Sequence, residues 1–186
     1  MSIFVIDVEA DGPVPGLYSM VSFAAVLLEP GFTHTFKGFC APISNNFEMK
    51  NLAVSKHSRE EHLLFEPPQT VMPRFGNWVQ TLSKGKTVLL SDNPTFDGAF
   101  MSYYLHAYTG VNPFGHSARR IGDFCAGLKK AWTAGSEFKK LRSTAHTHDP
   151  LDDARGNAEA FVALCRLHNI ELPGWPYPFA ATDVQA

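Results

Sequence analysis

The chain has 186 residues, of which 45% are apolar and 18% charged, and its formal net charge is −2. This length fits one domain with a buried core, and the composition excludes a largely disordered or repetitive chain. A nearly neutral chain is not expected to hold long duplexes by phosphate neutralisation alone, although a bound divalent metal would add positive charge that this count omits. We therefore expect one globular domain over residues 1–186.

The three cysteines, Cys40, Cys125 and Cys165, are far apart, odd in number and without the spacing of metal ligands. They are typical of small buried side chains in a reducing compartment. The N-terminus lacks a basic stretch followed by an apolar one, and no segment approaches the roughly 18 apolar residues of a membrane span. The sequence therefore predicts a cytoplasmic protein.

The first forty residues predict three strands. Residues 2–8 are rich in β-formers and almost continuously apolar, which suits a central strand buried on both faces. Residues 20–28 predict a second strand, and Pro30-Gly31 turns the chain back into a third strand over residues 32–40. The start of the chain therefore predicts a buried strand followed by a hairpin.

The rest of the chain predicts helices that alternate with two short strands. Residues 42–66 are irregular, apart from a short helix start at Ser58. The later predicted elements are an amphipathic helix through Val71–Leu82, a strand over Thr87–Leu90, a helix capped by Asn93 and running to about Tyr108, a strand over 118–122, a helix over 123–132, a helix from Pro150 to about His168 and an irregular tail from about 170 to 186. This order implies an α/β fold, a mixed five-stranded sheet flanked by helices, with its site beyond the carboxyl ends of the central strands.

Two acidic residues, Asp7 and Glu9, follow the apolar part of the first predicted strand. Because side chains at i and i+2 of a strand point to the same face, these two carboxylates project together. Burying two like charges is costly without a compensating cation, and a divalent metal would supply one. The alternative is a strand that simply emerges into solvent at this point.

Two further acids lie at predicted helix starts. Asp97 is in the first turn of its helix, where the helix dipole favours an acid, but its helix face continues with large apolar and aromatic side chains. In the last helix, Asp153 lies at the edge of the apolar stripe, whereas Asp152 lies on the charged face. We therefore predict Asp97 and Asp153 as site residues and rank Asp92 and Asp152 below them.

His148 lies five residues before Asp153, in the loop that leads into the last helix. A neutral imidazole beside a metal-bound water is a suitable general base near pH 7. The alternative is an ordinary exposed loop histidine, and His146 is only two residues away. The proximity of Asp153 favours His148 as the base.

These acids and the histidine lie in three short motifs. The first is Phe4-Val-Ile-Asp7-Val-Glu9-Ala-Asp-Gly12, the second Asn93-Pro-Thr-Phe96-Asp97-Gly-Ala-Phe100 and the third His148-Asp-Pro-Leu-Asp-Asp153. Their order and spacing resemble the DEDDh-type 3′→5′ exonucleases, the ribonuclease T and DNA polymerase III epsilon-like enzymes of the ribonuclease-H-like fold. The resemblance spans residues 3 to about 165. Pro150 replaces the usual alanine of the third motif, and Ala10 replaces the hydroxyl residue common in the first.

The resemblance implies a metal-dependent 3′→5′ exonuclease that uses two Mg²⁺ or Mn²⁺ ions and releases nucleoside 5′-monophosphates. Asp7 would bridge the ions, Glu9 and Asp153 would hold the ion that carries the attacking water, and Asp97 would complete the other. His148 would remove the proton of that water. The expected substrate-binding residues are Ala10, Asp11, Gly12, Asn93, Phe96 and Phe100, with core packing as the alternative for the two phenylalanines.

The implied partner is the 3′ end of a single-stranded nucleic acid, with RNA favoured over DNA because the resemblance is closest to stand-alone ribonuclease-T-like domains. A homodimer is a candidate assembly. Seven of the 16 Lys and Arg residues lie between Arg119 and Arg142, either as a guide for a phosphate backbone or as an ordinary solvated face. The other hypotheses are a catalytically silent nucleic-acid-binding or polymerase-associated module and a small-nucleotide phosphohydrolase.

Overall fold

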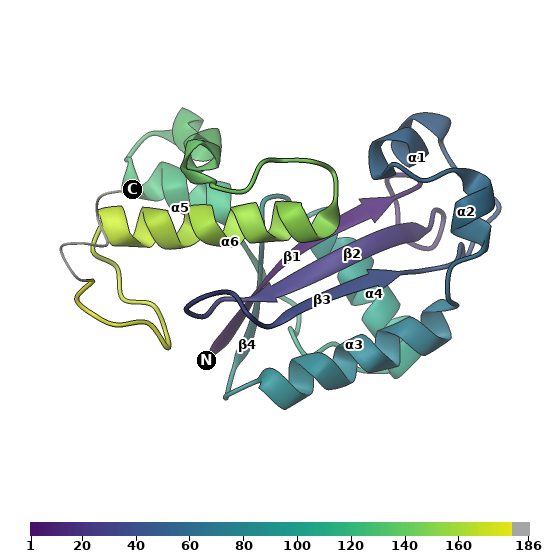
Figure 1. The fold of residues 1–186 in the computed structure, drawn as a ribbon, viewed down its shortest axis with the longest axis horizontal. Helices are drawn as coiled ribbons and strands as arrows, with labels where there is room; N and C mark the ends of the chain where they lie inside the picture. Colours follow the sequence, from purple (N-terminus) through teal and green to yellow (C-terminus); the bar gives the residue numbers. More distant parts are fainter. Residues whose placement is uncertain (180–186) are drawn as a thin grey trace.

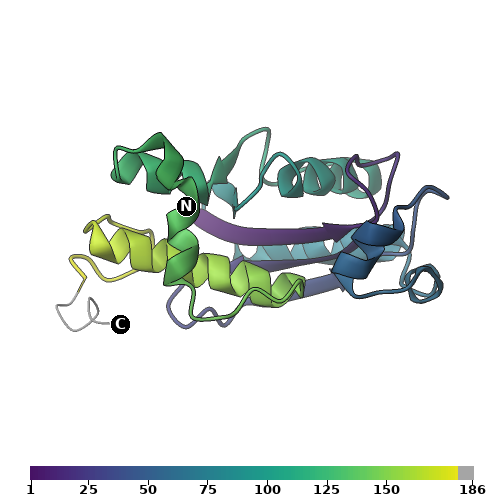
Figure 2. The same ribbon diagram turned by 90° about the horizontal axis from the view of Figure 1, so that it is seen from above.

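The computed structural model describes residues 1–179, which build a five-stranded mixed sheet with helices on both faces (Figures 1 and 2). The strand order is β3-β2-β1-β4-β5, so β1 is central. Strand β1 pairs antiparallel with β2 and parallel with β4. Of the outer pairs, β2·β3 is antiparallel and β4·β5 is parallel. The strands are β1 (Ser2–Ala10), β2 (Met20–Leu27), β3 (Thr35–Phe39), β4 (Thr87–Ser91) and β5 (Ala118–Arg120). The predicted α/β fold is confirmed.

The helices of the described residues connect and cover these strands. They are α1 (Met49–Ser55), α2 (Arg59–Leu63), α3 (Pro68–Leu82), α4 (Asp97–Thr109), α5 (Ile121–Leu128), the 3₁₀ helix η1 (Trp132–Leu141) and α6 (Pro150–Leu167). Residues 170–179 form no helix or strand, as predicted, and the rest of the predicted tail, residues 180–186, lies outside the described residues. None of the helices within residues 1–179 is long and apolar enough to cross a bilayer.

Two helices lie where the sequence predicted none. Helix α1 falls in the segment predicted to be irregular, and it buries only Leu52 and Ser55, so it has no extended apolar stripe to reveal it. Helix η1 repeats every three residues rather than every 3.6, which hides it from a search for α-helical periodicity. The helix start at Ser58 is confirmed, because its hydroxyl accepts from the Glu61 amide while the Glu61 carboxylate accepts from the Ser58 amide.

The start of α4 differs from the prediction. Asn93 is not its N-cap; residues 94–96 form a turn, and the helix begins at Asp97. The Asn93 carbonyl accepts the amides of Phe96 and Asp97, and the Asn93 amide in turn donates to the Asp97 carboxylate at 3.3 Å. Asp97 therefore supplies the side chain that holds this turn together, which is the role the sequence assigned to Asn93.

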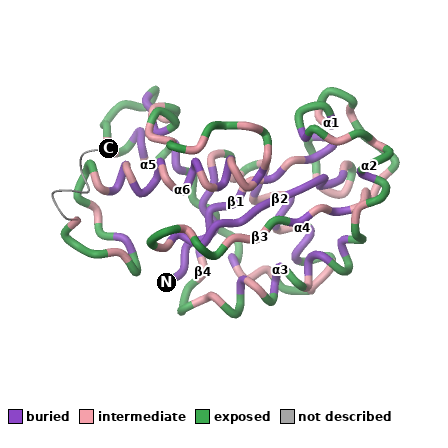
Figure 3. Tube along the Cα trace, in the orientation of Figure 1, coloured by how far each residue is buried: buried purple, intermediate pink, exposed green. Residues whose placement is uncertain are grey.

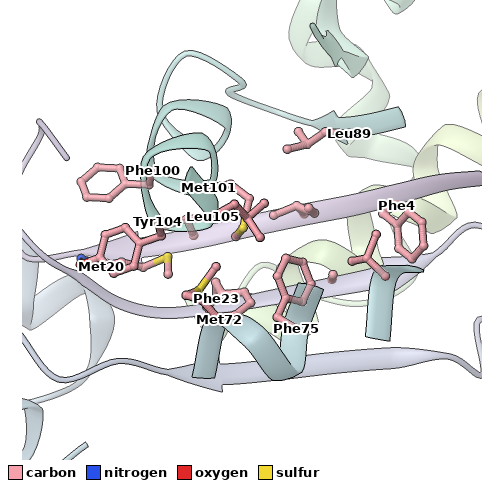
Figure 4. Packing of buried hydrophobic residues seen from close by; sticks show 14 of the residues in the cluster. Phe4, Met20, Phe23, Met72, Phe75, Leu89, Phe100, Met101, Tyr104 and Leu105 are labelled. Carbon is pink, nitrogen blue, oxygen red and sulfur yellow. The ribbon is translucent and has the colours of Figure 1, made fainter. Parts of the chain in front are cut away.

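The two faces of the sheet carry separate apolar clusters. On one face Phe4 and Ile6 pack under α3 and α4, where Phe75 and Tyr104 are completely buried (Figure 4). On the other face Val5 packs against α5, η1 and α6. Strands β1 and β2 are therefore buried along most of their length, whereas much of the loop leading into α6 is exposed (Figure 3). This explains the nearly continuous apolar sequence of β1.

The alternation of β1 decides where its acids point. Asp7 and Glu9 have the parity of Val5, so they lie on the face that α6 covers. Helix α6 begins above the carboxyl half of β1 (Figure 1), and β4 ends beside the middle of β1 before the chain turns into α4. Three segments that are far apart in the sequence therefore meet at one edge of the sheet.

The Tyr104 hydroxyl provides a test of this packing. It accepts the Met20 amide at 2.7 Å inside the α4 cluster. Replacing Tyr104 with Phe leaves a buried amide without a partner, so the free energy of unfolding in urea is expected to fall by about 1–3 kcal/mol. Tyr103→Phe is the matched control, because this neighbouring side chain is exposed, and it should change stability by less than about 0.5 kcal/mol. Equal effects of the two substitutions would contradict the assigned packing.

Candidate active site

Asp7, Glu9 and Asp153 form a compact cluster of carboxylates. One oxygen from each lies within 4.8 Å of the others. The β1·β2 pairing holds Asp7 opposite Ala24 and Glu9 opposite Ser22, so the strand backbone is fixed where the acids project. Asp153 comes from the first turn of α6 and is only 1% exposed, whereas Asp152 is turned aside and accepts the Thr147 hydroxyl. The structure thus brings together the two acids of the first strand and the acid of the last helix, which are far apart in the sequence.

Asp97 lies beside this cluster. Its Oδ1 accepts the Val8 amide and its Oδ2 the Asn93 amide, both at 3.3 Å, so one carboxylate ties β1 to the segment before α4. The side chain is 4% exposed. Its charge acts on Asp7 and Glu9. The competing acid, Asp92, instead pairs with Lys139 at 2.6 Å. Of the two candidates on this segment, only Asp97 joins the buried group.

The acids are held together against their mutual repulsion. Burial raises the pKa of Asp7 well above its ordinary value, and the charges of Asp97, Asp153 and Glu9 raise this pKa further. Burial and the charge of Asp153 raise the pKa of Glu9 to about 7, and burial raises the pKa of Asp97 to about 7. Among the protein's own cations, Arg142 lowers the pKa of Asp7 and Lys56 that of Glu9 without reversing either shift. Additional positive charge is therefore needed to stabilise the ionised form of these acids.

The loop before α6 wraps around the Asp153 carboxylate. The amides of Thr147 and His148 donate to its Oδ1 and Oδ2, each at 3.0 Å. His148 has a φ of 59°, in the left-handed region, and the next residue, Asp149, caps α6 by accepting the Leu151 amide. Upstream, Glu159 accepts three hydrogen bonds from Ser143 and Thr144. Hydrogen bonds thus hold the histidine-bearing segment in place at both of its ends.

Both histidines of this loop face the acids. Nδ1 of His148 lies 3.7 Å from Glu9 Oε1, and Nδ1 of His146 lies 2.8 Å from Asp153 Oδ1. The two rings are 4.3 Å apart between centroids and are both about half exposed. The sequence predicted His148 at the site, and the structure places it there. The approach of His146 to Asp153 was not anticipated, and the His-x-His spacing was its only sequence signal.

The substrate-binding residues predicted in the first motif are buried and make contacts within the protein. The carboxylate of Asp11 is buried, accepts the Ser19 amide at 2.5 Å and pairs with Arg59 at 2.9 Å. A side chain on Gly12 would meet the ring of Tyr18 at 2.0 Å, so the close approach that this glycine permits is that of Tyr18. We correct the assignment of Asp11, because its polar groups are already used. Ala10 is buried at the end of β1.

The predicted residues of the second motif divide into two groups. Phe100 is completely buried and packs on Phe96 with a ring separation of 4.9 Å, so of the two roles that the sequence left open for it the structure shows core packing and not substrate binding. Phe96 is partly exposed, and Asn93 is exposed. Of the six predicted substrate-binding residues, Phe96 and Asn93 are therefore the two that solvent can reach.

The basic stretch from Arg119 to Arg142 is largely paired. Arg120 pairs with Asp123, Lys129 with Glu137, Lys139 with Asp92, and Arg142 donates to Asn157. Two further cations were not anticipated: Lys37 reaches across from β3 to Asp149 at 2.5 Å, and Lys56 lies near Glu9. Neither has a local sequence signal, because each acts on a residue far away in the chain.

This architecture, with an acid cluster beyond the central strands, defines a nuclease-type site on a ribonuclease-H-like fold. No family model matches the sequence. A curated protein from Escherichia coli, "3'-5' DNA exonuclease Cap18", is 38% identical over 171 residues, covering 87% of this chain and 90% of that protein. The chain therefore belongs to the DEDDh-type 3′→5′ exonucleases, enzymes that act on nucleic acid.

Solved structures support the fold. The nuclease domain of 3'hExo, a DEDDh family member bound to rAMP, superimposes with a TM-score of 0.69 at 16% identity and covers 90% of this chain and 92% of its own. Exonuclease I of E. coli in complex with a dA16 oligonucleotide gives a TM-score of 0.62 at 15% identity, and the match covers 89% of this chain and 41% of that one. The shared domain thus accounts for less than half of the second protein.

The raised pKa values predict how the metal-free protein responds to pH. Between pH 4.5 and about 7 the folded protein keeps a proton on Glu9 that the unfolded chain has released, so stability falls as the pH rises through this window. In chelator, Glu9→Gln is expected to raise the Tm by about 3 °C or more at pH 8, because it removes the repelled charge, and by much less at pH 5. An equal change at both pH values would refute the electrostatic origin.

Proposed function

We propose that the chain hydrolyses the terminal phosphodiester of single-stranded nucleic acid from the 3′ end and releases nucleoside 5′-monophosphates. The gathering of Asp7, Glu9 and Asp153 from two distant segments, with Asp97 beside them, is the observation that carries this proposal. A catalytically silent module would have no need to hold buried acids at such raised pKa values.

The residues present fit a pair of divalent cations. The donors are carboxylate oxygens, which Mg²⁺ and Mn²⁺ prefer, and the acids lack enough positive charge of their own. Asp7, Glu9, Asp97 and Asp153 would hold the ions, and Asp7 is the central acid of the cluster because the charges of the three others all act on it. Bound ions would stabilise the charge on the phosphate and on the displaced 3′-oxygen.

His148 would accept the proton of the attacking water. Its imidazole faces Glu9 and remains half exposed, so water and a terminal phosphate can reach it. The Asp153 carboxylate holds the His148 amide, and the Lys37–Asp149 pair anchors the following residue. The water oxygen bonds to the phosphorus, and the bond from the phosphorus to the 3′-oxygen of the preceding nucleotide breaks. That 3′-oxygen takes a proton from solvent and becomes the new 3′-hydroxyl, while the phosphate remains on the 5′ side of the released nucleotide. Asn93 and Phe96 would contact that nucleotide.

Single-stranded DNA is the substrate that we favour. The curated E. coli relative is named a DNA exonuclease, and it is 38% identical over most of both chains. RNA, which the sequence analysis favoured, is the alternative, because discrimination depends on contacts to the 2′-hydroxyl. A small-nucleotide phosphohydrolase would instead act on short phosphodiesters without regard to strand length.

The activity is tested with 5′-labelled single-stranded DNA and RNA of the same sequence, in Mg²⁺, Mn²⁺ or chelator. We expect a ladder that shortens from the 3′ end, only with metal and faster on DNA. Asp7→Ala is the matched control and should leave both strands intact, because it removes the central acid of the cluster. Faster degradation of RNA would reverse the substrate preference, and cleavage of small diesters alone would replace the exonuclease by a phosphohydrolase.

The two loop histidines are predicted to differ in their effect on catalysis. His148→Ala should lower the rate with Mg²⁺ by about 10²-fold or more, because it removes the proton acceptor. His146→Ala should lower the rate by less than about tenfold. Single-turnover rates on saturating substrate provide the measurement. The opposite order of effects would assign the base to His146.

A further inference from the structure

The His146–His148 loop brings a second imidazole to the acid cluster, and the proposed hydrolysis uses only one. His146 Nδ1 lies 2.8 Å from Asp153 Oδ1, and one ligand atom from each of His146, His148 and Asp153 lies within 4.8 Å of the others. The ring of His146 packs edge-on against that of His148. Two nitrogens and one oxygen therefore converge at the solvent-facing side of Asp153.

The backbone keeps these three donors together. Because Thr147 and His148 donate their amides to the two oxygens of Asp153, the loop cannot move away from this carboxylate without breaking both bonds. Thr147 itself points elsewhere, since its hydroxyl donates to Asp152 and accepts the Asp149 amide. The side chains on either side of Thr147 are thus the two imidazoles, both held over the same acid.

This donor set differs in kind from the acid cluster. Asp7, Glu9 and Asp153 offer only oxygens, which suit Mg²⁺ and Mn²⁺, whereas two imidazoles and one carboxylate are typical ligands of Zn²⁺. We propose that His146, His148 and Asp153 form a separate zinc site, with its remaining coordination position open to solvent because both rings are about half exposed. Tetrahedral zinc separates its nitrogen and oxygen ligands by about 3.3 Å, so the 2.8 Å contact opens by roughly 0.5 Å on binding.

Sharing Asp153 makes the two sites compete, a consequence that rests on the proposed function. A zinc ion held by both histidines removes His148 from proton transfer and occupies a carboxylate that the hydrolysis requires. The three cysteines are free and buried, so thiolates do not offer the described residues a rival zinc site at the surface. Zinc should therefore inhibit hydrolysis supported by Mg²⁺, and His146 should be the residue that confers this sensitivity.

Calorimetric titration of Zn²⁺ into the protein, with millimolar Mg²⁺ present, tests the site independently of activity. We expect one zinc ion per chain, and at least about tenfold weaker binding by His146→Ala because a ligand is lost. His168→Ala removes an exposed histidine outside the loop and should bind as the unaltered protein does. Glu9→Gln should also retain zinc, because Glu9 belongs to the carboxylate cluster and is not one of the three proposed zinc ligands. Unchanged binding by His146→Ala, or lost binding by Glu9→Gln, would overturn the proposal by moving zinc into the acid cluster.

A second measurement follows the Mg²⁺-supported rate on 5′-labelled DNA as zinc is added, with each protein normalised to its own rate without zinc. The unaltered protein should be inhibited at the concentration at which zinc binds, and His146→Ala should need at least about ten times more. Equal inhibition of both would show that the histidine pair is not the inhibitory site. If no strand is degraded at all, the exonuclease proposal fails, while the calorimetric result still decides whether zinc binds.

Discussion

Repulsion among the carboxylates at the end of β1 is the constraint on which the rest of the site depends. Desolvation and neighbouring charges raise the pKa of Asp7, Glu9 and Asp97 together, so the metal-free protein near neutral pH retains protons on these acids that free carboxyl groups would have released. Such a group persists only because the fold determines its geometry. Two large apolar clusters clamp the central sheet from both faces, and the β1·β2 ladder continues to the last residue of β1.

Asp153 links this electrostatic centre to the loop that supplies the histidines. Its two oxygens accept the amides of Thr147 and His148, while the same carboxylate faces Asp7 and Glu9. Any ion or proton that changes the charge on Asp153 therefore acts on the loop as well as on the acids. This coupling links both proposals, since the exonuclease reaction and the zinc site both use the Asp153 carboxylate.

The sequence predicted most of what depends on local periodicity. Strands β1, β2 and β4 follow from apolar runs, and helix-face reasoning distinguished the buried Asp153 from Asp152, which binds Thr147 instead. Features that depend on distant partners were missed. Asp11 looked available until its partner proved to be Arg59, 48 residues along the chain.

Two other misses have local causes. Asn93 looked like a helix cap, but the Asp97 carboxylate holds that turn instead. His146 approaches Asp153 in a loop whose backbone is left-handed at His148, a conformation that is uncommon for a residue other than glycine and that the sequence does not signal. Long-range partners and unusual backbone conformations therefore set the limit on prediction here.

The central claim, that the gathered acids form a site for divalent cations around Asp7, is tested most directly by counting bound Mn²⁺. Titration followed by electron paramagnetic resonance should show two ions per chain for the unaltered protein. It should show Mn²⁺ binding greatly weakened in Asp7→Asn, because the substitution removes the charge of the central acid of the cluster. Two ions bound equally well by Asp7→Asn would contradict the account and separate the acid cluster from the metal site.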